Sequence, residues 1–286
     1  MRRPETPEVI FSSLFFLLAV FSMLVIGLSR YAMGFSQLLA LVSVGGGIYE
    51  WITVALLGAG SIGAFYFFIL SVKKEELSWK YKTLMVCIGL LFLGAAIFEL
   101  RESNLFKGLG TQEILMIFKE GQEAIERTVP WSEVRYLFDG VFYISFLFLP
   151  LLFWHGSIEF DKSDSLGHIL HTLRPRLNVI IAMNFGYCIQ SYFFSSWWGA
   201  VDTTLLILAL ALLWSLVYRK KHLVGFYESF NLFLLVILLL LCVLSRDLLA
   251  SVMEHYAMRK TFYALAIFGW AMLWMEKVTR HAKHRH

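Results

Sequence analysis

The chain has 286 residues, of which 58% are hydrophobic and 16% are charged, and its formal net charge is +4. Soluble globular domains contain about 45–50% apolar and about 25% charged residues, so this composition excludes a water-soluble domain. Residues 1–286 are therefore predicted to form a single all-α integral membrane domain, a polytopic bundle of transmembrane helices. The net charge does not favour nucleic-acid binding, because the lysines and arginines lie mainly in short loops.

Eight apolar segments predict about eight membrane spans, and seven is the alternative count. The fifth segment is interrupted by Asn184, Gly186 and Gln190, and the eighth begins beside Arg259 and Lys260. The first is longer than the apolar core of a signal peptide, which has about 7–15 residues, so it is interpreted as a helix. The predicted spans are 10–29, 49–72, 83–100, 136–154, 177–196, 201–218, 228–245 and 258–276.

The distribution of basic residues predicts the orientation of these spans. With the N-terminus in the cytoplasm, the larger share of the lysines and arginines falls in the two termini and in the second, fourth and sixth loops. Short basic loops stay on the cytoplasmic side of a membrane. Both termini are therefore predicted to be cytoplasmic.

The loop formed by residues 101–135 is predicted to lie at the outer face. Its segment "TQEILMIFKEGQEAIERT" places Ile114, Leu115, Phe118 and Ile125 at near-helical spacing with acidic residues between them. This pattern is typical of an amphipathic helix on a membrane surface. The alternative is a mobile acidic loop.

Charged residues collect near the predicted outer ends of the spans, most densely in "IFELRESN", residues 97–104. A charge inside the apolar zone costs about 2.5–3.5 kcal/mol and usually faces a bundle interior or a cavity, where it is paired. We expect this for carboxylates inside a span, whereas charges at span ends are also explained by side chains that reach the headgroups. The candidate catalytic carboxylates are Glu99, Glu102 and Asp139, and the candidate binding residues are Arg101, Arg246, Asp247, Glu50 and His255.

The signs of these charges allow pairing. Arg101 and Arg246 are the cations available to the carboxylates Glu99, Asp139 and Asp247. An acid close to a second acid favours a bound cation, a neighbouring arginine or a raised carboxyl pKa. Such a cluster would serve either as a structural ion-pair network or as a functional site.

The stretch "RESNLFK" resembles a motif of uncharacterised bacterial multi-pass inner-membrane proteins, in which a helix ends in Arg-Glu followed by an acid and a His-Lys pair. Arg101, Glu102 and Lys107 match this motif, and Glu50 followed by a tryptophan is similar to another feature of that group. Asn104 replaces the acid, and a phenylalanine replaces the histidine. The resemblance implies a bacterial inner membrane but no activity.

The sequence contains no nucleotide-binding, hydrolase or metalloprotease motif. His168 and His171 are three residues apart, but a zinc site needs three or four ligands on a rigid frame, so neither a metal site nor a cofactor is predicted. A non-catalytic membrane subunit or sensor, which binds a membrane protein partner or a lipid headgroup at its outer face, is the first hypothesis. The alternatives are an intramembrane enzyme that acts on a lipid or lipid-linked substrate at the outer leaflet, and a transporter of small solutes or lipids.

Overall fold

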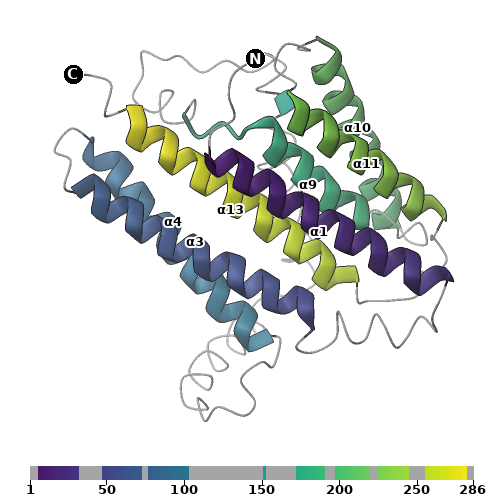
Figure 1. Ribbon diagram of the computed structural model, residues 1–286, viewed down its shortest axis with the longest axis horizontal. Helices are drawn as coiled ribbons and strands as arrows, with labels where there is room; N and C mark the ends of the chain where they lie inside the picture. Colours follow the sequence, from purple (N-terminus) through teal and green to yellow (C-terminus); the bar gives the residue numbers. More distant parts are fainter. Residues whose placement is uncertain are drawn as a thin grey trace.

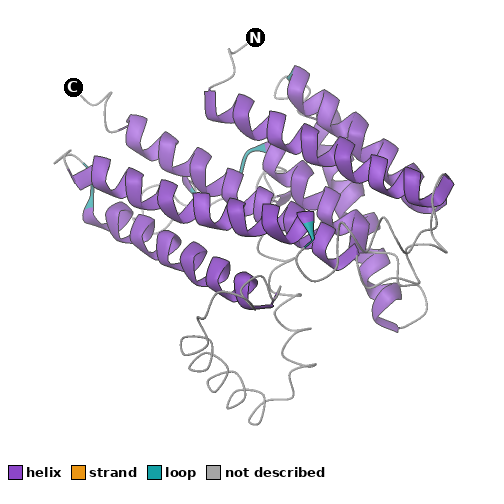
Figure 2. Ribbon diagram, turned by 60° about the horizontal axis from the view of Figure 1, so that its bottom comes forward, coloured by secondary structure: helices purple, strands orange, loops and turns teal. Residues whose placement is uncertain are grey.

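The computed structural model describes residues 6–31, 47–72, 77–102, 151–152, 172–190, 197–219, 225–244 and 255–281. Every regular element within these ranges is an α-helix, which confirms the predicted all-α class (Figure 2). The helices run lengthwise along roughly one direction (Figure 1). They are α1 (Thr6–Tyr31), α3 (Ile48–Val72), α4 (Trp79–Glu102), α9 (Leu177–Gln190), α10 (Trp197–Arg219), α11 (Phe226–Leu244) and α13 (His255–His281).

Three of these helices are long and apolar enough to cross a membrane: α1 over Glu8–Leu28, α3 over its whole length, and α4 over Trp79–Leu100. Shorter apolar stretches lie in α9, α10 and α11. The predicted count of eight spans and the cytoplasmic position of both termini remain predictions. The fourth predicted span lies outside the described residues except for a helical pair at 151–152, and so does the proposed amphipathic helix of the 101–135 loop.

The C-terminal helix α13 occupies the centre of the described bundle. Figure 1 shows it between the α3–α4 hairpin on one side and α1, α9 and α11 on the other. One hydrophobic cluster packs α1, α9, α10 and α11 against α13, and a second packs α3 and α4 against it. Ile267, Phe268 and Trp270 contact both clusters. The two halves of the hydrophobic core are therefore joined along one helix.

This central position explains why α13 tolerates polar residues. No side chain from Ala257 to Thr279 is exposed, although this stretch contains Arg259, Lys260 and Glu276. Inside a bilayer, ionisable side chains are tolerated where protein groups surround and pair them. By contrast, α4 carries exposed apolar side chains, among them Leu91, which is 73% accessible.

Small residues let α3 and α4 approach closely, as in many membrane helix pairs. A Cβ atom added to Gly60 of α3 would lie 2.8 Å from the ring of Phe92 on α4. At the next residue of α3, the hydroxyl of Ser61 donates a hydrogen bond to the Gly89 carbonyl of α4, at 3.0 Å. The two helices thus pack closely, and the end of α4 lies beside the start of α13, where Glu99 contacts Lys260.

Candidate functional site

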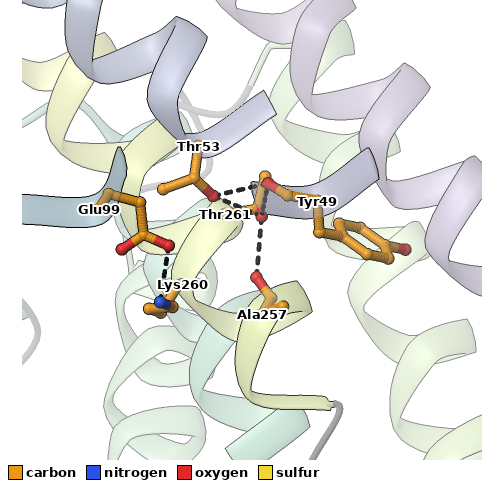
Figure 3. Close-up of polar contacts among 6 residues, drawn as sticks. All are labelled: Tyr49, Thr53, Glu99, Ala257, Lys260 and Thr261. Atoms are coloured by element: carbon orange, nitrogen blue, oxygen red, sulfur yellow. Dashed lines mark hydrogen bonds and ion pairs between the residues drawn. The ribbon is translucent and has the colours of Figure 1, made fainter. Parts of the chain in front are cut away.

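A polar cluster lies where α3 and α13 begin and α4 ends. We call Tyr49, Thr53, Glu99, Lys260 and Thr261 the first polar cluster (Figure 3). Glu99 of α4 is buried, with 5% of its surface accessible. The Lys260 ammonium of α13 lies 2.6 Å from the Glu99 Oε1 atom, so the two charges form a buried ion pair between the helices.

Hydroxyl groups join α3 to α13 in the same cluster. The Thr53 and Thr261 Oγ1 atoms are 2.8 Å apart, and both lie within hydrogen-bond distance of the Tyr49 carbonyl oxygen, at 2.8 and 3.0 Å. Thr261 also reaches the Ala257 carbonyl one turn earlier, at 2.8 Å. The Tyr49 hydroxyl donates to the Ser22 Oγ atom of α1 at 2.7 Å. Four helices therefore meet through polar contacts at this end.

The structure adds a cation that we did not consider for Glu99, because it places Lys260 on this carboxylate. We had named Arg101 and Arg246 as the cations available to Glu99, Asp139 and Asp247; the Arg101 side chain and Arg246 lie outside the described part of the chain, so that pairing stays a prediction. The spacing along α4 gave no information about α13, which is far away in sequence. Lys260 had been noted only as a charge beside which the eighth predicted span begins.

The other predicted site residues are only partly placed. Glu50 lies half-buried in the first turn of α3, one residue after Tyr49. The backbone of three more residues is helical, with Arg101 and Glu102 ending α4 and His255 beginning α13, so all three lie at the end that holds the first polar cluster. The predicted residues that lie outside the described ranges are Asp139, Arg246 and Asp247.

A second polar cluster lies at the opposite end of the bundle, where α1, α9 and α11 begin. Its members are Glu8, Ser12, Arg176, Asn178, Glu228 and Asn231. The Arg176 guanidinium contacts the Glu8 carboxylate at 2.6 Å. The Asn178 Nδ2 atom donates to the Glu228 Oε1 atom at 3.1 Å and approaches the Ser12 Oγ atom at 3.4 Å, and the Asn178 Oδ1 atom accepts from Asn231 at 3.1 Å.

Glu228 also caps the helix to which it belongs. Its Oε2 atom accepts a hydrogen bond from the Gly225 backbone N–H at 3.0 Å, and the Ser229 hydroxyl donates to the Gly225 carbonyl at 2.9 Å. A glutamate in the third helical position that bonds back to the capping residue satisfies a backbone donor that the helix leaves unpaired. One carboxylate thus fixes the start of α11 and ties it to α9.

The sequence pattern did not lead us to this second cluster, because we followed charges at the predicted outer ends of the spans. A signal was present: Asn178 and Asn231 are amides within or beside apolar segments. Amides in a membrane helix usually bond across to another helix. The Nδ2 atom of Asn184, the asparagine that we did single out, donates locally to the Ile180 carbonyl at 2.9 Å.

The two clusters have similar chemistry. Within the described ranges, no group of three or more His, Cys, Asp or Glu residues gathers in a way that would hold a metal ion. Glu99, Glu8 and Glu228 contact a cation or an amide from another segment of the chain, and these contacts join the helices to one another. Such buried contacts cost desolvation energy but fix which helices meet and in which register.

In comparisons with known proteins, no protein-family model matches the chain, and neither a curated protein nor a solved structure matches it.

Proposed function

We propose that this chain is a non-catalytic subunit or sensor of a multi-pass membrane assembly. The observation that carries this proposal is the Glu99–Lys260 ion pair, which joins α4 to α13 at 2.6 Å. This pair engages Glu99, one of the three candidate catalytic carboxylates, in a structural contact. Around it, the hydroxyl groups of Tyr49, Thr53 and Thr261 bond between helices.

The burial of Glu99 favours this function over catalysis. A general base must come within hydrogen-bond distance of a substrate proton. Glu99 is 5% accessible and already lies against an ammonium group. A substrate would have to displace Lys260 to reach it, and the displacement would leave a buried charge uncompensated.

The membrane and topology belong to the same proposal. We place the chain in a bacterial inner membrane with about eight spans and both termini in the cytoplasm. The three membrane-length helices α1, α3 and α4 support a membrane location. The basic loops support the orientation, and the motif at Arg101 and Glu102 supports the bacterial setting. In this orientation the first polar cluster lies at the outer face.

The exposed apolar faces of the α3–α4 hairpin are the surfaces that we assign to the partner or to lipid. Ile62 and Tyr66 of α3 and Leu91 of α4 point away from both hydrophobic clusters and are more than half accessible, at 73%, 58% and 73%. Lipid chains and membrane helices both cover such surfaces. The first polar cluster would hold the hairpin in the position at which the partner meets it.

Purification from the native membrane tests the proposal. The tagged chain, extracted in mild detergent, is expected to retain a membrane protein in a fixed ratio, identified by mass spectrometry. Lys260→Ala is expected to lose that partner, because it frees the end of α4, whereas Arg219→Ala at the exposed end of α10 serves as the matched control. A wild-type chain that purifies without a stoichiometric partner would contradict the subunit function.

A further inference from the structure

The α3–α4 hairpin is fastened to the rest of the bundle at one end. There the Tyr49 hydroxyl donates to the Ser22 Oγ atom of α1 at 2.7 Å, and the rings of Phe21 and Tyr49 lie 5.6 Å apart. The Oγ1 atoms of Thr53 and Thr261 join α3 to α13 at 2.8 Å. The ion pair at 2.6 Å joins α4 to α13 at the same end (Figure 3). Both helices of the hairpin therefore have a polar attachment to α13 there.

Towards its other end, the hairpin packs mainly on α13. Leu56 of α3 still packs against the hydrophobic cluster that contains α1 and α9, whereas Leu57 packs against the second cluster. Apart from Leu173, the described members of the second cluster come from α13, from the two hairpin helices and from the connection between them. Figure 1 shows the hairpin lying along the side of α13 that faces away from α1, α9 and α11.

The contact between α3 and α13 in this part consists of small and flexible side chains. Gly63 faces Met272, so that a Cβ atom added to the glycine would lie 2.7 Å from the Met272 Sδ atom. Ala64 of α3 and Ala271 of α13 are both buried in the same cluster. Methionine adapts its shape to its surroundings, and small residues let helices approach closely. Such a contact permits a small sliding movement between packed helices.

One buried group in this contact has a polar atom without a partner. Trp274 of α13 is 3% accessible, and its ring lies beside the Tyr81 ring of α4, with the centroids 6.3 Å apart. The Trp274 Nε1–H has no hydrogen-bond partner among the described residues. Trp270, one turn earlier, donates its Nε1–H to the Leu173 carbonyl at 2.6 Å. Because a buried donor without an acceptor is costly, a shift of the hairpin that offers Trp274 an acceptor would be favoured.

We propose that the α3–α4 hairpin is a lever with two positions: it pivots at the first polar cluster, and its opposite end, where α3 ends and α4 begins, moves against α13. The hairpin moves as one body, because Gly60 lies close against Phe92 and Ser61 bonds to the Gly89 carbonyl. The lever links the two ends of the bundle whichever partner the chain binds. This inference is therefore independent of the subunit function.

Distances between spin labels on α1 and α3 test the lever. The full-length protein, with its native cysteines replaced, is placed in lipid nanodiscs. Leu24→Cys/Trp51→Cys flanks the hydrogen bond between α1 and α3, and Ile10→Cys/Val72→Cys lies at the opposite end; all four side chains are between 50% and 55% accessible. A helix rises 1.5 Å per residue, so a rotation of about 5–10° about Tyr49 moves Val72, about 35 Å away, by about 3–6 Å. The second pair is expected to show a distance distribution broader by this amount or split in two, and the first pair a narrow one.

Two substitutions act on the two parts of the lever. Trp274→Phe removes the donor that lacks an acceptor, so it is expected to narrow the distribution of the second pair. The same substitution at Trp214, which is exposed on α10, serves as the matched control and should leave that distribution unchanged. Tyr49→Phe removes the bond to Ser22 and is expected to broaden the distribution of the first pair, because that bond holds the pivot.

A third pair of labels separates movement of the hairpin from fraying of α3. Val72→Cys/Leu91→Cys lies within the hairpin and is expected to give a narrow distribution. A broad distribution for this pair would overturn the proposal, because α3 would then move without α4. An Ile10–Val72 distribution as narrow as the Leu24–Trp51 distribution in the otherwise unsubstituted protein would also overturn it, since the hairpin would then be fixed at both ends.

Discussion

At the scale of single residues, the molecule relies on buried polar groups that are useful only as pairs. A buried charge without its partner costs more than the intact pair contributes. The side chains of Glu99 and Lys260 are 7% and 18% accessible, so neither finds enough water when the other is removed. The same reasoning applies to Asn178, which contacts side chains from two other helices.

Replacing one member of the Glu99–Lys260 pair is expected to destabilise the protein more than replacing both. Lys260→Met alone should lower the free energy of unfolding by about 3–5 kcal/mol, because Glu99 stays buried without its cation. Glu99→Gln/Lys260→Met should recover much of this loss. A double-mutant cycle, followed by denaturant unfolding in detergent, measures the coupling. Additive effects would mean that the ion pair contributes nothing beyond its two side chains.

Two buried asparagines of α9 should respond in opposite ways to the same substitution. Asn178→Leu removes the donor to Glu228 and the acceptor for Asn231, so a loss of about 1–3 kcal/mol is expected. Asn184→Leu should be neutral or stabilising, since the Asn184 Oδ1 atom has no hydrogen-bond partner among the described residues. Both positions are 0% accessible, which makes them a matched pair. Equal losses of thermal stability would show that the hydrogen bonds of Asn178 do not matter.

At the scale of elements, close approach of α3 to α4 decides which glycines can change. Gly60→Leu would drive a side chain into the ring of Phe92, which is buried, and overpacking of this kind costs about 1–3 kcal/mol. Gly58→Leu should be tolerated, because a Cβ atom there meets nothing within 4 Å. Thermal unfolding of the two variants in one detergent compares them directly. A Gly58 variant as unstable as the Gly60 variant would contradict the packing.

The elements also show what the sequence could and could not predict. Apolar length located α1, α3 and α4 to within a few residues, because a span leaves a contiguous signal in one segment. The role of α13 was not predictable in this way: its polar residues made the eighth span look weak. Those residues are tolerated because other helices surround α13, and no local pattern encodes which helices are neighbours.

The candidate site, too, could be predicted from the sequence only in part. The position of Glu99 inside a predicted span indicated a buried role, since an isolated charge there is costly. Its partner Lys260 is 161 positions away in sequence, and only the packing of α4 on α13 brings the two together. The contacts of Asn178 to Ser12 and Glu228 likewise join segments that no spacing rule connects.

At the scale of the whole molecule, the orientation in the membrane can be tested from the two ends of the bundle. Ile48→Cys and Arg219→Cys place a thiol at the start of α3 and at the end of α10, both exposed positions, in a chain whose native cysteines are replaced. With both termini in the cytoplasm, a membrane-impermeant maleimide should label position 48 in intact cells and position 219 only after permeabilisation. The reverse pattern would invert the topology.

The most direct test of the central claim, that the first polar cluster fastens helices and carries out no chemistry, is a charge exchange. Glu99→Lys/Lys260→Glu keeps an ion pair between α4 and α13 but reverses its direction. The proposed function predicts that each single variant loses stability and its co-purifying partner, and that the exchanged pair regains both. An exchanged protein that folds with wild-type stability but no longer retains the partner would contradict it, because the position of the carboxylate itself would then matter.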